Sequence, residues 1–262
     1  MSFLPKLTRR WWIAAALAGF AAALPARAET PPALIHVAFV GDSMADGLWG
    51  AMFRRLGKDK CLADRIRLIR KAKNGTGLTR LDGFNWIDEI GRIVDESHPD
   101  LVVGSFGIND RQGIVEKDKR AVAYPSPAFD TRYQAIVVEA IHAALAQGGS
   151  MMIVGLPIML EDDVNADAEA KNKIFEAAVK EAGSDKASFA QPWTSGATPE
   201  IYKPYLPNAK GAMALVRASD GIHFTTLGYD MVMEAIYPPL LASLKARGRD
   251  LAAECPSRVG TR

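Results

Sequence analysis

Cysteine, net charge and cofactor motifs are all scarce in this sequence. Its 262 residues include only two cysteines and four histidines, and the formal net charge is +2. No HExxH pattern and no cluster of cysteine and histidine indicates a catalytic metal, and no GxGxxG or Walker loop indicates a nucleotide. A nearly neutral chain also carries no electrostatic footprint for nucleic acid. We therefore expect no metal, no organic cofactor and no nucleic-acid partner.

A long apolar run stands at the N-terminus. Residues 11–24 follow two arginines, Arg9 and Arg10, and an A-x-A cleavage site ends at Ala28. This is the pattern of a secretory signal peptide over residues 1–28. A transmembrane anchor is the alternative, but the run is shorter than the roughly 20 residues that span a bilayer. We expect cleavage near Ala28 and a periplasmic or secreted mature protein with no stable membrane anchor.

The two cysteines, Cys61 and Cys255, both remain after this cleavage, in a compartment where disulfides persist. They could join the C-terminal tail, residues 249–262, to the loop after the first helix. Two free buried thiols are the alternative, because pairing cannot be deduced from the sequence.

Strand-like apolar runs alternate with helical patterns between residues 29 and 248. This alternation predicts a parallel sheet with helices on both faces. Because parallel crossovers are right-handed, we expect a three-layer α/β/α sandwich of flavodoxin-like type, with a mostly parallel five-stranded sheet in a single domain. The expected strands are 35–40, 66–70, 101–106, 151–155 and 188–191. The expected helices are 44–56, 86–96, 132–146, 166–182 and 226–247.

Two segments, 111–129 and 193–217, do not fit this alternation. Both follow predicted strands, and both are long for connecting loops. We expect them to cover the functional site.

Chemically useful side chains follow the predicted strands, at the edge of the sheet where function gathers in such folds. Ser43, in the triplet GDS, ends the first strand, and Thr76 follows the second. Asn109 follows the third strand, and His223 comes directly before the last helix. An isolated GDS is most often a plain turn or a helix cap. The convergence of four such groups at one edge favours a nucleophile at Ser43 instead.

His223 is the one histidine expected at this edge. The other three lie in the first strand, before the third strand and in mid-helix: His36, His98 and His142. Asp220 comes three residues before His223. A carboxylate there can accept the imidazole Nδ1 proton and leave Nε2 to take the proton of a serine. The pair therefore predicts a general base.

Four sequence blocks resemble, in order, those of the SGNH (GDSL-type) hydrolases. They are VGDSMADG around Ser43, NGTGL, GIND at 107–110 and DGIH at 220–223. The combination of TGL, FNW, VGLP and RASDGIHFT is similar to the DUF459 branch of that superfamily. The resemblance extends from about residue 35 to the last helix.

The resemblance implies that Ser43 is the nucleophile, that His223 is the general base and then acid, and that Asp220 orients His223. It also implies an oxyanion hole made of the Ser43 N–H, the Asn109 side-chain amide and a glycine N–H of the NGTG block. Removing one such donor typically costs about 2.7 to 4 kcal/mol of transition-state stabilisation. Gly77 is the preferred glycine because of its TGL context, and Gly75 is the alternative.

The same resemblance implies a carboxylic-ester hydrolase, and the signal-peptide pattern implies that it is exported. Removal of acetyl groups from a carbohydrate or peptidoglycan is the first expectation for its substrate. Asp42 and Arg217 are candidates for contacting the substrate, although Arg217 could equally hold its loop. The alternatives are an O-acetyltransferase acting on envelope glycan and a non-catalytic envelope protein that binds glycan.

Overall fold

The computed structural model describes Met1, residues 33–191 and residues 201–255. The chain divides into two compact units, 1–32 and 33–262, and the second contains every helix and strand that the structure describes. Apart from Met1, the predicted signal peptide lies outside the described residues, as do positions 193–200 of the second long segment.

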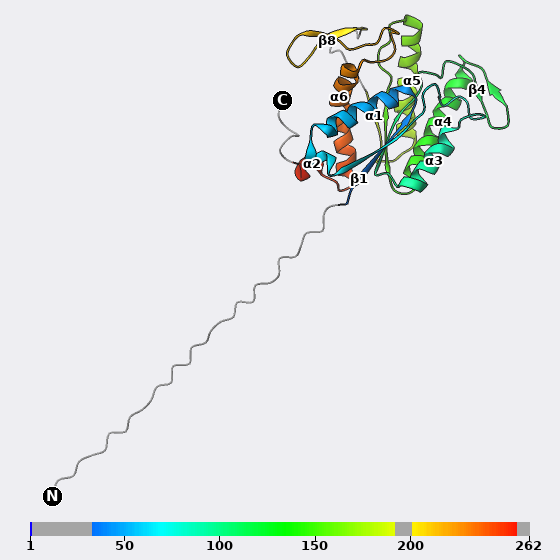
Figure 1. The fold of residues 1–262 in the computed structure, drawn as a ribbon. Helices are drawn as coiled ribbons and strands as arrows, with labels where there is room; N and C mark the ends of the chain where they lie inside the picture. The colour runs from blue at the N-terminus through cyan, green and yellow to red at the C-terminus, as the bar shows by residue number, and fades with distance from the viewer. Residues whose placement is uncertain (2–32, 192–200, 256–262) are drawn as a thin grey trace. The chain divides into compact units, whose positions relative to one another are not determined.

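A five-stranded sheet occupies the middle of the unit, with helices on both faces (Figure 1). Its strand order is β2-β1-β3-β6-β7, and every neighbouring pair is parallel. The strands are β1 (Ile35–Gly41), β2 (Ile66–Ala72), β3 (Leu101–Ser105), β6 (Ser150–Val154) and β7 (Ala187–Ala190). The predicted α/β/α sandwich is confirmed. The direction of winding reverses between β1 and β3, so the end of β1 is the switch point where such sheets bind ligands.

Alternate residues of β1 point to opposite faces of the sheet, as a strand requires. Val37 and Phe39 pack in the core beneath α1 (Ser43–Gly57) and α6 (Thr226–Ala246). The neighbouring residues Ala38 and Val40 pack in a second core on the other face. That second core is covered by α3 (Trp86–Ser97), α4 (Pro127–Leu145) and α5 (Asp162–Glu181). Each face of the sheet thus has its own apolar layer.

Two helices begin a full turn or more earlier than predicted. The α4 helix starts at Pro127 instead of residue 132, because Ser126 accepts a hydrogen bond from the Phe129 N–H and caps the helix. Pro127 suits the first turn, where no N–H partner is needed. The α5 helix starts at Asp162 instead of residue 166, with acidic side chains in its first turn.

The two cysteines form a disulfide. Cys61 lies in α2 (Lys60–Ala63), and Cys255 follows the short α7 (Leu251–Glu254). The described part of the predicted tail is therefore tied to the body, and Leu251 is fully buried against it. Of the helices that the structure describes, none combines the length and the apolarity needed to cross a bilayer.

Each of the two long segments contains a small hairpin. The first pairs β4 (Ile114–Val115) with β5 (Ala121–Val122), and the second pairs β8 (Tyr205–Pro207) with β9 (Met213–Leu215). The first hairpin bonds to the loop after β2, through the Val115 N–H and the Thr79 carbonyl. The second bonds to the segment before α6, where Thr225 Oγ1 donates to the Leu215 carbonyl. Each described hairpin is therefore hydrogen-bonded to a loop beyond the end of the central sheet.

Candidate active site

The site is built where β1, β2 and β3 end together. Gly41, the last residue of β1, pairs with Ala72 on one side and with Ser105 on the other. Gly41 has a φ of +131°, and a Cβ there would stand 1.9 Å from the Ser105 carbonyl oxygen. Only glycine permits this approach. The loops after the three strands consequently leave the sheet side by side.

Ser43, His223 and Asp220 form one hydrogen-bonded chain. Ser43 Oγ lies 2.7 Å from His223 Nε2, and His223 Nδ1 lies 2.7 Å from Asp220 Oδ2. When Nδ1 donates its proton to Asp220, Nε2 is left to accept the serine proton. The side chains of His223 and Asp220 are 32% and 47% exposed, so the dyad is open to solvent.

The turn that carries this dyad is held by Asp220 itself. Its Oδ1 accepts the backbone N–H groups of Ile222 and His223, both at 2.9 Å. Partial burial alone would raise the pKa of Asp220, but these two N–H groups and the imidazole of His223 outweigh it and lower the pKa. Asp220 is therefore ionised at neutral pH and available to His223.

Arg217 supports the same turn from beneath. Its side chain is 2% exposed, and the guanidinium donates to the carbonyl oxygens of Ile158 at 2.6 Å and Ile222 at 2.8 Å. It also lies 4.5 Å from the centre of the Phe224 ring. The expectation that Arg217 contacts a substrate is wrong, because its donors are taken by backbone carbonyls inside the protein.

Asn109 is joined to the loop after β2. Its side-chain amide donates to the Thr76 carbonyl oxygen at 2.8 Å. The Thr76 hydroxyl in turn donates to the Lys73 carbonyl and accepts the indole N–H of the buried Trp86 at 3.0 Å. One amide proton of Asn109 is thereby used for positioning, and the other is left for a ligand.

The two glycines of the NGTG block have different surroundings. Gly77 is buried, and a Cβ there would stand 1.9 Å from Asp110 Oδ1. Gly75 is exposed with a φ of +74° and no neighbour within 4 Å of the corresponding position. Gly75 therefore provides the positive φ that the turn needs, whereas Gly77 lies too close to Asp110 of the GIND block for any side chain to fit.

Asp110 anchors that arrangement, and the sequence pattern alone gave it no role. This fully buried carboxylate accepts the N–H groups of Leu78 at 3.0 Å and Thr79 at 3.2 Å. It also accepts the Thr79 hydroxyl at 3.0 Å and the Tyr133 hydroxyl at 2.7 Å. Its position directly after Asn109 in the GIND block is the sequence feature that could have indicated this role. Four donors hold the carboxylate, which in turn fixes the loop containing Gly77.

Asp42 is fully buried and caps α1 by accepting the Met44 N–H at 2.8 Å. The pKa of Asp42 is raised to about 8, mainly by burial and also by the charge of Asp110, while the N–H groups of Met44 and Ile108 oppose the rise. The expectation that Asp42 contacts a substrate is wrong, because no part of this side chain reaches the surface. Its place is beneath the nucleophile, where it sets the start of the helix.

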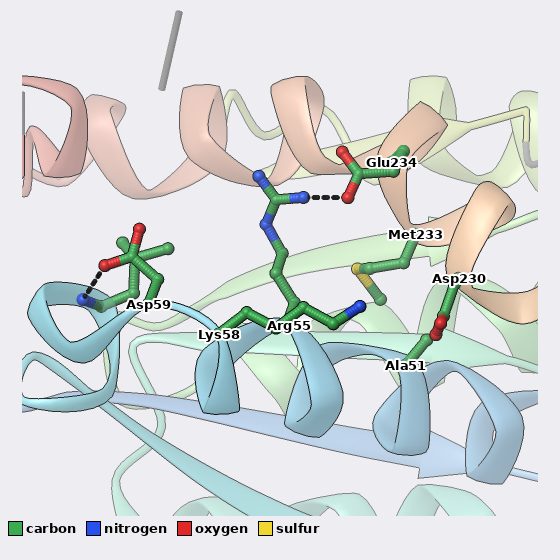
Figure 2. Close-up of a pocket in the computed structure, with 8 residues that line it drawn as sticks. Ala51, Arg55, Lys58, Asp59, Asp230, Met233 and Glu234 are labelled. Carbon is green, nitrogen blue, oxygen red and sulfur yellow. Dashed lines mark hydrogen bonds and ion pairs between the residues drawn. The ribbon is translucent and has the colours of Figure 1, made fainter. Parts of the chain in front are cut away.

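A cleft of about 250 Å³ lies elsewhere, between α1, α2 and α6. Figure 2 shows Arg55 rising from α1 toward Glu234 on α6, with which it forms an ion pair. Lys58 and Asp59 also line this cleft, and none of the site residues does.

A serine, a histidine and an aspartate joined at the switch point of this sheet are typical of the SGNH (GDSL-type) hydrolase class, and the fold is the fold of that class. The chain belongs to the DUF459 family: residues 36–239 match the family described as "Protein of unknown function (DUF459)". A comparison with curated protein sequences gives no match.

Solved structures of similar fold include three at low sequence identity. A carbohydrate esterase family 3 protein from Talaromyces cellulolyticus has a TM-score of 0.56 and 15% identity, over 81% of this chain and 99% of that one. The acetylxylan esterase Axe2 from Geobacillus stearothermophilus has a TM-score of 0.52 and 17% identity, over 81% and 94%. TesA has a TM-score of 0.51 and 16% identity, over 79% and 99%. These likenesses show the fold.

Proposed function

We propose that the protein is an exported serine esterase that hydrolyses carboxylic esters through an acyl-enzyme. The observation that carries this proposal is the chain from Ser43 Oγ through the His223 imidazole to Asp220, with both contacts at 2.7 Å. A turn or helix cap needs no such chain. A nucleophile, a base and an orienting carboxylate need all three groups in this order.

Acylation begins when His223 Nε2 removes the Ser43 proton as Oγ attacks the ester carbonyl carbon. The carbonyl oxygen becomes an oxyanion, which the N–H groups of Ser43 and Gly77 and the free amide proton of Asn109 stabilise. Ser43 is the first residue of α1, so the positive end of the helix dipole adds to this stabilisation. The imidazolium then gives its proton to the departing alkoxide, and the acyl group stays on Ser43.

Deacylation repeats the sequence with water. His223 takes a proton from the water as its oxygen attacks the acyl carbon, and then returns that proton to Ser43 Oγ as the carboxylic acid leaves. Asp220 stays ionised throughout and stabilises the imidazolium. The exposure of the dyad gives water direct access to the acyl-enzyme.

For the substrate we propose an O-acetylated carbohydrate of the cell envelope. Support comes from the printed names of two proteins of similar fold, an acetylxylan esterase and a carbohydrate esterase. Because the His223–Asp220 dyad is open to solvent, the site also suits an acetyl group carried on a polymer better than it suits a ligand that must be enclosed. The signal-peptide pattern supports a periplasmic or secreted location.

The first test is hydrolysis of p-nitrophenyl acetate and its longer acyl homologues by the chain beginning at Glu29. We expect turnover in the wild type, falling with acyl length, and none in Ser43→Ala. Ser97→Ala is the matched control, because Ser97 ends α3 at the opposite edge of the sheet. Equal turnover by wild type and Ser43→Ala would overturn the assignment.

If neither protein shows turnover, the next assay supplies an acetylated glycan as the substrate, with and without a sugar acceptor. Acetate release would restore the esterase proposal. Acetyl transfer to the acceptor would replace it with the O-acetyltransferase alternative, and glycan binding without either reaction would leave a binding protein.

A further inference from the structure

One face of the β8–β9 hairpin is apolar and exposed. In the register of this antiparallel pair, Tyr205 stands opposite Leu215 and Pro207 stands opposite Met213. Directly opposed residues and their second neighbours share one face of a sheet, so these four side chains lie together. Tyr205 is 51% exposed, Met213 64% and Leu215 47%, and Pro207 is also exposed.

The opposite face of the hairpin behaves differently. Leu206 and Ala214, which alternate with the four, are partly buried. The hairpin therefore has one partly buried apolar face and one that the residues described by the structure leave exposed. Figure 1 shows the hairpin, in yellow, standing out from the helices that cover the sheet. A contiguous exposed apolar face of this kind marks an interaction surface.

This face is fixed to the loop of the candidate active site. The Val216 N–H donates to the Pro204 carbonyl, and Thr225 Oγ1 donates to the Leu215 carbonyl. The backbones of Arg217 and Phe224 also pair with each other in an antiparallel β-bridge. The hairpin thus leads directly into the turn that holds Asp220 and His223.

The charged residues of the hairpin segment itself are basic, and the acidic residues Glu200 and Asp220 flank the segment in the sequence. Residues 201–219 contain Lys203, Lys210 and Arg217 and no aspartate or glutamate. Arg217 is buried, whereas Lys210 is exposed at the tip of the hairpin. There the side chain of Asn208 accepts the N–H groups of Lys210 and Ala212 and holds the turn. The exposed face is consequently apolar, with the exposed Lys210 at the tip of the hairpin and the half-buried Lys203 before β8.

We propose that this hairpin face docks reversibly on an anionic lipid surface. Tyr205, Met213 and Leu215 enter the interfacial layer, and Lys203 and Lys210 lie near the lipid headgroups. Apolar side chains with lysines beside them suit a bilayer whose headgroups are negative. Docking would hold the turn of Asp220 and His223 close to the membrane plane. The proposal does not depend on the esterase assignment.

The size of the face favours lipid over a protein partner. A stable protein–protein interface buries about 800 Å² on each partner, and four half-exposed side chains on two short strands cannot supply that area. A bilayer interface accepts a small apolar insertion without requiring shape complementarity. The lysines add electrostatic attraction to anionic headgroups, which a neutral apolar partner would not provide.

The test is sedimentation of the chain beginning at Glu29 with vesicles. This form lacks the apolar run 11–24, which would itself bind lipid, and keeps the compact unit 33–262 intact. The vesicles are phosphatidylglycerol mixed with phosphatidylcholine in one arm and phosphatidylcholine alone in the other. We expect binding to the mixed vesicles that weakens with added salt, and little binding to the neutral ones.

Variants locate the binding. Met213→Ser combined with Leu215→Ser should lower partitioning at least tenfold, since the removed apolar surface drives insertion. Lys210→Gln should lower it about fivefold, the equivalent of about 1 kcal/mol for one lysine near an anionic surface. Leu34→Ser is the matched control, because Leu34 is 48% exposed and precedes β1, far along the chain from the hairpin. Circular dichroism melting verifies that each variant folds.

Three results would overturn the proposal. They are failure of the wild type to bind mixed vesicles, unchanged binding by the folded Met213→Ser, Leu215→Ser variant, and equal binding to both vesicle types. Light scattering supplies a further arm: a dimer that the same variant abolishes would assign the face to a second copy of the chain instead.

Discussion

The side-chain amide of Asn109 donates a 2.8 Å hydrogen bond to the carbonyl oxygen of Thr76, 33 residues earlier in the chain. This bond joins the loop after β2 to the turn after β3. The Thr76 hydroxyl is held in its turn by the indole of Trp86, at 3.0 Å. The orientation of the proposed oxyanion donor therefore depends on a buried tryptophan that touches no substrate.

Thr76→Val tests this dependence. The variant leaves the buried Trp86 indole N–H without its acceptor, which costs about 1–3 kcal/mol of stability. It also loosens the loop that orients Asn109, so we expect kcat to fall about tenfold with a smaller change in KM. The measurement is steady-state hydrolysis of p-nitrophenyl acetate beside urea unfolding. Thr76→Ser keeps the hydroxyl and should restore both values; an inactive but stable Thr76→Ser would contradict this account.

Asn109→Ala removes one of the three proposed oxyanion donors. Loss of a single such donor typically lowers kcat by about 10²–10³. Labelling of Ser43 by a fluorophosphonate probe should decline less, because the nucleophile and its base remain in place. Turnover and labelling are measured on the same preparation. A variant with wild-type kcat, or a probe found on another serine, would show that the site is misplaced.

Asp42 makes stability depend on pH. Its pKa of about 8 in the folded protein is above the value of about 3.9 for an unfolded aspartate. Between these two values the folded state holds a proton that the unfolded state has released, so the free energy of unfolding falls as pH rises through this window.

Asp42→Asn removes this titration and keeps a side-chain oxygen that can cap Met44. We expect the wild type to lose stability relative to this variant between about pH 4 and about pH 8. Urea unfolding of both proteins across the window measures the difference. Parallel stability profiles would mean that Asp42 does not carry the proton.

The disulfide between Cys61 and Cys255 closes a loop across a sequence separation of 194 residues. Replacing both cysteines with serine should lower the free energy of unfolding by about 2–5 kcal/mol. None of the proposed catalytic residues lies on α2 or α7, so turnover at low temperature should be unchanged. Urea unfolding of the wild type with and without a reducing agent supplies the matching comparison. Unfolding unaffected by both treatments would contradict this role.

The alternation of strands and helices could be predicted from the sequence because it rests on local patterns. The apolar runs of β1 and β3 are short and continuous, as in strands buried on both faces. The boundary at Pro127 was missed because the cap at Ser126 precedes the apolar repeat on which the prediction relied. The layered arrangement then followed from the right-handedness of parallel crossovers.

The candidate site likewise contains residues that the sequence could predict and contacts that it could not. Ser43, His223 and Asp220 were predictable as a set, because each carries reactive chemistry in a local block at a predicted strand or helix end. Asp110 and Thr76 were present in the same blocks, but their contacts could not be seen. Hydrogen bonds between residues 31 to 33 positions apart depend on how two loops meet.

The sequence by itself determined the five strands of the central sheet, the presence of the five long helices and the polar groups at the ends of the central strands, because apolar periodicity and turn residues act locally. Only the tertiary structure decided that Asp42 and Arg217 are buried supports, that Cys61 reaches Cys255, and that one face of the β8–β9 hairpin stays uncovered. Burial and pairing depend on residues brought together from distant parts of the chain, as Ser43 and His223 are across 180 positions.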